Sequence, residues 1–336
     1  MKFIVGVYTT SPCLYEWDEK LATEYINGIK ELSMVRGLEH PFWGKLHKFD
    51  DNWFLKNIKR SWDFVFTCIP GTMIEMSKNP HFGLASDKES GRKAALRFIE
   101  KARKAVENIN GYLKRSAVIA VQLHSAPNRS IENVHSSKES FSRSLKEIVA
   151  WNWHNARLVV EHCDAMTEDH QPEKGFLSID DEIASVSELN QSYNNNNPIG
   201  IVINWGRSVL EERNVFAPIK HVQKAREAGL LCGLMFSGCS NQNTEWGVWK
   251  DTHMPPPKEL NNKYFAEKSL MNAICIKNTL LESKFDKLDY IGIKIMDLQK
   301  GTNMQRRIGL NADTLLILDQ IINKLSVKNK ENIIKD

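Results

Sequence analysis

The sequence predicts an α/β protein that folds as a single (β/α)8 barrel. Eight short apolar segments with the composition of buried strands alternate with stretches of helical periodicity along the 336 residues. No change in composition divides the chain, and α/β barrels commonly reach this length as one domain. The signatures GxGxxG after the first strand, GxxxxGK[ST] and GxSxG are missing, which removes the main support for a doubly wound open sheet.

The predicted strands are apolar runs that end at polar or turn-forming residues. They cover 2–8, about 37–39, 63–69, 117–123, 158–161, 199–203, 230–236 and 290–296. The helices predicted between and after them include 17–35, 87–114, 137–153, 261–283 and 311–325, with others starting near Asp180 and Pro218. We therefore expect a barrel over residues 1–325 and a charged, frayed tail at 326–336.

Composition narrows the classes of partner and compartment. The chain has 45 basic and 41 acidic residues and a formal charge of +4, which gives no support for a nucleic-acid partner. The apolar run at 1–8 is too short for a signal peptide, and no later run reaches the roughly 20 residues of a membrane span. The six cysteines form no CxxC pair. We expect a soluble, cytoplasmic protein with free thiols and no membrane partner.

Polar residues follow the predicted strands at their carboxyl ends, where a barrel places its active site. In the clearest case, an apolar strand runs into Glu161, His162, Cys163 and Asp164. Side chains alternate along a strand, so Glu161 and Cys163 should face one side, and His162 and Asp164 the other. Closure of the barrel would bring these residues together with Glu39, His124, Asn204, Trp205, Arg207, Ser237, Lys294 and, from the long loop 239–257, Trp249, Asp251 and His253.

Each candidate also has a purely structural interpretation. Glu161 could form an ion pair with Lys294 or Arg207, and His124 could be a satisfied structural histidine. An inward Lys294 needs a carboxylate or an anionic ligand, because an unpaired buried lysine costs several kcal/mol, whereas an outward one could extend to solvent. Four tryptophans could either pack in the core or stack on the face of a sugar: Trp43, Trp205, Trp246 and Trp249.

Seven short stretches carry a family resemblance: Leu46-His47, Ile69-Pro70-Gly71-Thr72-Met73, His124-Ser125-Ala126-Pro127, Glu161-His162-Cys163-Asp164-Ala165, Ile203-Asn204-Trp205-Gly206-Arg207-Ser208, Met235-Phe236-Ser237-Gly238 and His253-Met254-Pro255-Pro256. Through them the chain resembles the xylose isomerase-like barrel superfamily, which includes sugar isomerases, ketose 3-epimerases and apurinic-site endonucleases. It looks most like an uncharacterised bacterial subgroup. The likeness covers nearly the whole length and is more specific for the fold than for the reaction.

The resemblance implies a divalent metal held by four residues: a Glu after strand five, an acid after strand six, a His after strand seven and a Glu after strand eight. Glu161 matches this set, but Asn204, Ser237 and Lys294 depart from it. Arg207 stands where the family often has a His. Asp251-Thr252-His253 resembles the Asp-x-His pair of the endonuclease branch, and His124 resembles the strand-four His of that branch.

These substitutions bear directly on the metal. Lysine in place of a carboxylate reverses the local charge, and two cations facing the site repel divalent metals. We therefore expect the ordinary metal site to be lost, and no cofactor is firmly indicated. A weaker Zn²⁺ or Mn²⁺ site made of His124, Glu161, Asp251 and His253 stays open.

The sequence favours a sugar isomerase or epimerase that transfers a proton next to a carbonyl. Glu161 would be the base, His124 or His253 the acid, and Lys294 with Arg207 the positive charge beside the enediolate. The small-molecule carbohydrate, with an anionic group if it has one, would contact Glu39, Asn204, Arg207, Ser237, Trp205 and Trp249.

Other classes remain open at this stage. A carbohydrate-binding barrel without catalysis would explain the degraded metal set. Glu39 and Glu161 could also serve a glycoside-cleaving or lyase reaction, while DNA repair would need a metal cluster and a basic face. The sequence does not decide the identity of the sugar, the direction of the reaction or whether the chain forms a homo-oligomer.

Overall fold

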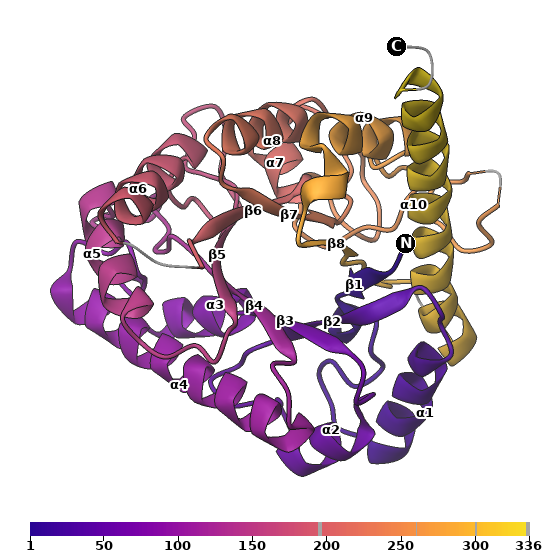
Figure 1. Ribbon diagram of the computed structural model, residues 1–336, viewed down its shortest axis with the longest axis horizontal. Helices are drawn as coiled ribbons and strands as arrows, with labels where there is room; N and C mark the ends of the chain where they lie inside the picture. The colour runs from indigo at the N-terminus through magenta and orange to yellow at the C-terminus, as the bar shows by residue number, and fades with distance from the viewer. Residues whose placement is uncertain (194–196, 260, 300, 334–336) are drawn as a thin grey trace.

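The computed structural model of the chain is a closed barrel of parallel strands inside a ring of helices (Figure 1). It describes residues 1–193, 197–259, 261–299 and 301–333, with the backbone alone for 328–333. Each strand pairs with the next along the chain, and the last pairs with the first. The single (β/α)8 barrel is therefore confirmed, with strands β1 (Phe3–Val5), β2 (Val35–Pro41), β3 (Asp63–Thr67), β4 (Val118–Leu123), β5 (Arg157–His162), β6 (Gly200–Asn204), β7 (Leu231–Phe236) and β8 (Tyr290–Ile293).

Helices connect the strands and cover the outside of the barrel. Several begin at a residue whose side chain accepts a hydrogen bond from a backbone N–H of the first turn, as Asp18, Asp50, Ser137, Ser178 and Asn272 do. The helices are α1 (Glu19–Lys30), α2 (Asp51–Asn57), α3 (Ile69–Lys78), α4 (Glu89–Leu113), α5 (Lys138–Val149), α6 (Ile179–Ser192), α7 (Trp205–Glu212), α8 (Ala217–Glu227), α9 (Ala273–Ser283) and α10 (Met304–Ile333), with 3₁₀ turns η1 (Val7–Thr9) and η2 (Phe285–Lys287).

Several boundaries differ from the sequence-based prediction; for example, β1 ends at Val5 and β8 at Ile293, earlier than expected. The helix predicted at 261–283 begins only at Ala273, because Asn262 bonds through its side chain to the backbone of Pro257 and Glu259 and holds a loop there. The third strand stops at Thr67, and Ile69 already starts α3, whose first turn accommodates Pro70.

The last helix, α10, is also longer than predicted. It runs from 304 to 333 and so enters the segment expected as a tail, 326–336, of which 334–336 lie outside the described residues. Nowhere in the described chain is a helix both long and apolar enough to cross a membrane. All six cysteines are free thiols, as predicted.

The barrel interior has an apolar layer below a polar one. The apolar layer consists of Ile4, Val65, Ala120, Val159, Val202, Cys232, Met235 and Tyr290. Two residues further toward the carboxyl end, the inward positions of β5 and β6 become polar: Val159 is followed by Glu161, and Val202 by Asn204. The apolar layer therefore closes the barrel from below, and the polar layer forms the floor of its carboxyl-end face.

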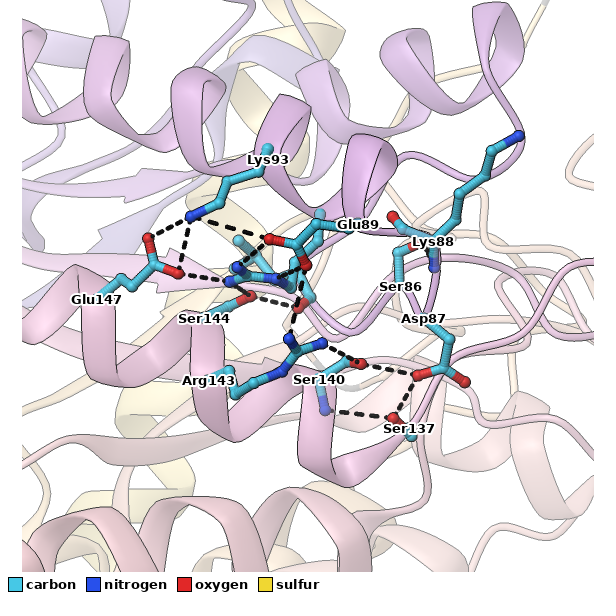
Figure 2. A network of polar contacts seen from close by, with 12 residues as sticks. Ser86, Asp87, Lys88, Glu89, Lys93, Ser137, Ser140, Arg143, Ser144 and Glu147 are labelled. Atoms are coloured by element: carbon cyan, nitrogen blue, oxygen red, sulfur yellow. Dashed lines mark hydrogen bonds and ion pairs between the residues drawn. The ribbon is translucent and has the colours of Figure 1, made fainter.

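Outside the barrel, polar contacts fix the start of α4 to α5 (Figure 2). Nζ of Lys93 lies 3.0 Å from Oε2 of Glu147, and the Ser140 hydroxyl donates to Oδ1 of Asp87 at 2.7 Å. These helices flank β4 and β5 in the chain. The contacts join α4 to α5, the two helices that precede the strands ending near His124 and Glu161.

Candidate functional site

Polar side chains from four consecutive segments meet at Glu161, which ends β5 on the inner face and is fully buried. Its Oε2 lies 2.9 Å from Nε2 of His124, which follows β4, and 2.7 Å from Nη1 of Arg207 in α7. Its Oε1 accepts a hydrogen bond from Nδ2 of Asn204, at the end of β6, at 3.2 Å. Glu161 is therefore engaged on both carboxylate oxygens.

The network continues from Arg207 into the loop after β7. Nε of Arg207 lies 3.2 Å from Oδ2 of Asp251, and the other oxygen of Asp251 lies 3.2 Å from Nδ1 of His253. Lys174 adds a second cation, with Nζ at 3.1 Å from Asp251. The Ser237 hydroxyl, after β7, donates to Oδ1 of Asn204 at 2.7 Å.

A second group of buried charges, the ion pair of Lys294 and Glu39, lies in the barrel interior. Lys294, directly after β8, places Nζ 3.1 Å from Oε2 of Glu39 in β2, and neither side chain is exposed. Nζ of Lys294 also lies 5.4 Å from the centre of the Tyr8 ring. Among the described residues, neither the Glu39 oxygens nor Nζ of Lys294 has a hydrogen-bond partner in well-aligned geometry. Glu39 and Lys294 are thus paired by charge, but both retain hydrogen-bonding capacity for a ligand.

Burial and neighbouring charges give the carboxylates of Glu161 and Glu39 different pKa values. Burial raises the pKa of Glu161, but the positive charges of Arg207 and Lys294 oppose it and hold that pKa well below the ordinary range. Burial also raises the pKa of Glu39, and there the attraction of Lys294 does not offset it. Glu161 is thus a fixed anion, whereas Glu39 can carry a proton.

The two other titratable groups of this layer are a neutral ring and a cation. Burial lowers the pKa of His124 to about 4, although the Glu161 carboxylate opposes the shift. Burial lowers the pKa of Lys294, but the charge interactions with Glu39, Tyr8 and Glu161 together outweigh it, and that pKa is raised above its usual value. At neutral pH His124 is uncharged and Lys294 is protonated.

An aromatic cavity opens above β1 and β2 and reaches Glu39. Its polar lining includes Lys48, whose Nζ lies 5.3 Å from the centre of the Trp43 ring. Ring-bearing residues form much of its wall, namely Tyr8, Trp17, Tyr25, His40, Trp43, His47, Phe49, Trp53 and Phe54. A cavity lined mainly by aromatic rings, with a few polar groups, is typical of binding sites for small molecules.

The candidate residues divide into three sets. His124, Glu161, Asn204, Arg207, Ser237, Asp251 and His253 form one connected network, and Glu39 and Lys294 form the adjoining pair. Trp205 lies in the apolar core, 1% exposed, and Trp249 is half-buried with the Arg213 guanidinium 5.8 Å from its ring centre. Neither tryptophan lines the cavity above Glu39.

Sequence reasoning did not select the aromatic wall of the cavity, apart from considering Trp43. A usable signal was present, because Trp43, His47, Phe49 and Trp53 lie within a short stretch that follows the strand carrying Glu39. Loops after barrel strands are where ligand contacts gather. Tyr8 was placed at the end of the first strand but was not considered as a ligand contact.

The interior residues do not fit a divalent metal. Arg207 bridges Glu161 and Asp251, so a guanidinium occupies the place between the two carboxylates that a metal would need. The weaker site considered for His124, Glu161, Asp251 and His253 does not assemble: among the residues that the structure describes, these four do not form a group of converging ligand atoms. Lys294 adds a second cation to the same interior.

Comparison with known proteins agrees with the fold and with the predicted resemblance. The family model "Domain of unknown function (DUF4862)" matches residues 4–310. An uncharacterized protein of Salmonella typhimurium is 34% identical over 311 residues, which cover 93% of this chain and 94% of that protein.

Solved structures with the same fold are more distant in sequence. A xylose isomerase-like TIM barrel/4-hydroxyphenylpyruvate dioxygenase fusion protein has a TM-score of 0.59 at 9% identity; the match covers 98% of this chain and 44% of the fusion. A sugar phosphate isomerase/epimerase from Parabacteroides distasonis has a TM-score of 0.53 at 11% identity, covering 94% and 97%. A family 2 AP endonuclease from Brucella melitensis has a TM-score of 0.54 at 13% identity, covering 92% and 97%. The barrel is xylose isomerase-like.

Proposed function

The chain belongs to the DUF4862 family, and from that premise we propose that it is a sugar isomerase or epimerase in which a buried lysine replaces the metal as the electrophile. The observation that carries the proposal is the Glu39–Lys294 pair, of which Glu39 lines the aromatic cavity. The barrel has the fold of a sugar phosphate isomerase/epimerase, and that likeness supports the substrate class.

The two residues have complementary roles in a proton transfer next to a carbonyl. Lys294 donates a hydrogen bond from Nζ to the carbonyl oxygen of the sugar, which becomes negatively charged as the enediolate forms. Glu39 takes the proton from the adjacent carbon and returns it on the same face to the neighbouring carbon, as an isomerase requires. An epimerase would need a second acid on the opposite face of the enediolate. A carboxylate whose pKa is raised by burial is the better base near neutral pH.

Glu161 has a different role from the one the sequence suggested. Its contacts with His124, Arg207 and Asn204 occupy both oxygens, and its pKa is far below the ordinary range. Such a carboxylate is a weak base. Glu161 therefore holds Arg207 and His124 in place and contributes negative charge that keeps Lys294 protonated.

The cavity fits a hydroxylated ligand. The aromatic wall offers faces for the C–H groups of a sugar ring. Oγ1 of Thr67, Oε1 of Gln122 and Nδ1 of His124 are buried without a hydrogen bond from the described chain, but these residues do not line the aromatic cavity. Lys48 in the same cavity suits an anionic group on the substrate.

The test is exchange of substrate C–H protons with solvent. Purified protein is incubated in D₂O with a panel of aldoses, ketoses, their phosphates and sugar acids, and ¹H NMR follows deuterium at the carbon next to the carbonyl. For an exchanging sugar, Glu39→Gln and Lys294→Met should each lower the rate by roughly 10²-fold or more. Exposed residues of the same types, in Glu132→Gln and Lys101→Met, serve as controls.

The result also separates catalysis from binding alone. If a sugar raises the unfolding temperature but no proton exchanges over long incubation, the barrel binds carbohydrate without transforming it. If exchange occurs and survives in Lys294→Met, the lysine is not the electrophile. Loss of exchange in the presence of a chelator, restored by Zn²⁺ or Mn²⁺, would instead assign the role of electrophile to a metal.

A further inference from the structure

A second polar cluster lies behind Glu161, between the barrel and its helices. His162, the last residue of β5, faces away from the interior, as strand alternation predicted. Its Nδ1 lies 2.7 Å from Oε2 of Glu182 in α6, and its Nε2 lies 2.9 Å from Oε2 of Glu211 in α7. His221 of α8 places Nε2 3.7 Å from the other oxygen of Glu211.

We propose that His162, Glu211 and His221 form a binding site for a divalent transition metal of the zinc type. One ligand atom from each of the three lies within 4.8 Å of the other two, and in the described part of the chain no other group of His, Cys, Asp or Glu converges in this way. Two imidazoles and a carboxylate are a ligand set that suits Zn²⁺. Glu212 approaches His221, with Oε1 3.7 Å from Nε2, but is not part of the converging group, so the fourth position is left open to a water.

The partners of the two rings support this assignment. A histidine that binds a metal through one nitrogen usually has its other nitrogen held by a carboxylate, carbonyl or hydroxyl. Nδ1 of His162 contacts the Glu182 carboxylate, which in turn accepts a hydrogen bond from the Ser125 hydroxyl at 2.5 Å. Nδ1 of His221 contacts the Ser208 hydroxyl at 3.0 Å. Both Nε2 atoms are thereby turned toward Glu211.

The charge balance also favours a dication. With a proton on both nitrogens of His162, the cluster holds two carboxylates, Glu182 and Glu211, and one positive charge, so it carries a net negative charge in a buried place. Replacing the Nε2 proton by a divalent metal makes the sum zero. Glu211, whose side chain is 14% exposed, provides the route of access.

A metal there would act on the barrel interior through α7. Arg207 precedes Glu211 by one helical turn and holds Glu161 from the inner side. A metal joining β5, α7 and α8 would fix the distance between α7 and β5, and with it the Arg207–Glu161 contact. The proposal does not depend on the reaction in the interior, because its ligands lie on the helix side of the strands.

The test uses the full chain, stripped with a chelator and dialysed into metal-free buffer. Zn²⁺ alone is titrated in by calorimetry, and bound zinc is measured by elemental analysis. We expect one equivalent of zinc and release of a proton, since metal replaces the proton on Nε2 of His162. Co²⁺ in its place should give the visible absorption of a tetrahedral site.

The variants separate ligands from neighbours. His221→Asn keeps a group near Ser208 but lacks Nε2, and Glu211→Gln keeps the shape but lacks the charge; both should abolish stoichiometric binding. Glu182→Gln, which alters only the support of His162, should weaken binding by about 10–100-fold. His170→Asn is the matched control, because His170 contacts the backbone of Leu210 outside the cluster.

Three outcomes would overturn the proposal. The first is no binding of Zn²⁺ above the background of His221→Asn. The second is binding that His221→Asn and Glu211→Gln leave intact, and the third is binding lost in His253→Asn, which would place the metal in the interior instead. If one of the variants does not fold, the other, together with the Co²⁺ spectrum of the unaltered chain, still decides the question.

Discussion

Nζ of Lys294 and Oε2 of Glu39 lie 3.1 Å apart at the end of the barrel, and solvent reaches neither side chain. Removing two charges from water costs several kcal/mol for each, which their attraction at best repays. Such a pair adds little stability over an apolar pair of the same size. Glu39 lines the aromatic cavity, and a buried charged pair that reaches a cavity is typical of a functional site.

The first prediction concerns the cost of separating that pair. Lys294→Met should lower the free energy of unfolding by about 3–5 kcal/mol, because it leaves the Glu39 carboxylate buried beside Glu161 without its cation. The double variant Lys294→Met/Glu39→Leu removes both charges and should recover most of the loss. Urea unfolding of the wild type, both single variants and the double variant gives the coupling energy. A double variant as unstable as Lys294→Met would show that the pair is not coupled.

A second prediction tests how closely the pair is packed. Gly6 lies beside it: a Cβ there would be 3.0 Å from Cγ of Lys294 and 3.1 Å from Oε2 of Glu39. Gly6→Ala should therefore lower the free energy of unfolding by about 1–3 kcal/mol. Gly111→Ala is the control of opposite sign. Gly111 lies inside α4, and apart from the neighbouring backbone of that helix no described atom lies within 4 Å of its added Cβ. Alanine there should stabilise by about 0.5–1 kcal/mol. A neutral Gly6→Ala would mean that Lys294 moves freely.

Much of the barrel could be predicted because the signals are local. The β5 segment shows its apolar run and its polar end within eight residues, and alternation alone places Glu161 inward and His162 outward. The need of an inward Lys294 for a carboxylate followed from the cost of burying charge. The candidate ion pair of Glu161 with Arg207 was also predictable, since both follow neighbouring strands.

The rest depends on contacts between distant segments. Whether Glu161 pairs with Lys294 or with Arg207 could not be decided from the sequence. Glu161 pairs with Arg207, and the partner of Lys294 is Glu39, which is far away in the chain. The position of Trp205 was also open. If the strand continued past the inward Asn204, alternation would turn Trp205 toward the surrounding helices, but α7 begins at Trp205 and the sequence does not show where the strand ends. The cluster of His162 with Glu211 and His221 joins three elements whose spacing shows no motif.

The third prediction concerns Arg207, which bridges Glu161 and Asp251. Arg207→Met should lower the free energy of unfolding by about 3–5 kcal/mol, because two buried carboxylates lose a shared cation. Arg207→Lys should recover only part of this, since one ammonium group does not reproduce a guanidinium that faces two carboxylates. Urea unfolding measures both.

The matched control for this prediction is a more exposed arginine pair. Arg157 lies 2.6 Å from Asp289, and the side chains are 23% and 47% exposed. Arg157→Met should cost no more than about 1 kcal/mol, because solvent screens the pair and already hydrates its partner. Equal losses in Arg157→Met and Arg207→Met would contradict the view that the buried bridge organises the interior.

The last prediction concerns the pH dependence of stability through His40. This ring is buried against Phe54, with centroids 4.2 Å apart, and its Nε2–H donates to the Leu46 carbonyl at 2.5 Å. Burial lowers its pKa from 6.5 to about 3. The folded ring stays neutral, whereas the ring of the unfolded chain takes up a proton below pH 6.5. Its contribution to stability is therefore complete above that pH and is lost as the pH falls toward 3.

Between pH 7 and pH 5 this one ring should account for a loss of about 2 kcal/mol in the free energy of unfolding. In His40→Gln, whose amide can still donate to Leu46 but does not titrate, the fall from pH 7 to pH 5 should be smaller by that amount. His135→Gln should leave the fall unchanged, because that ring is exposed and stays solvated in both states. Urea unfolding at the two pH values measures each difference. An unchanged fall in His40→Gln would show that the ring takes up its proton without unfolding, and that the wall of the cavity opens to admit water.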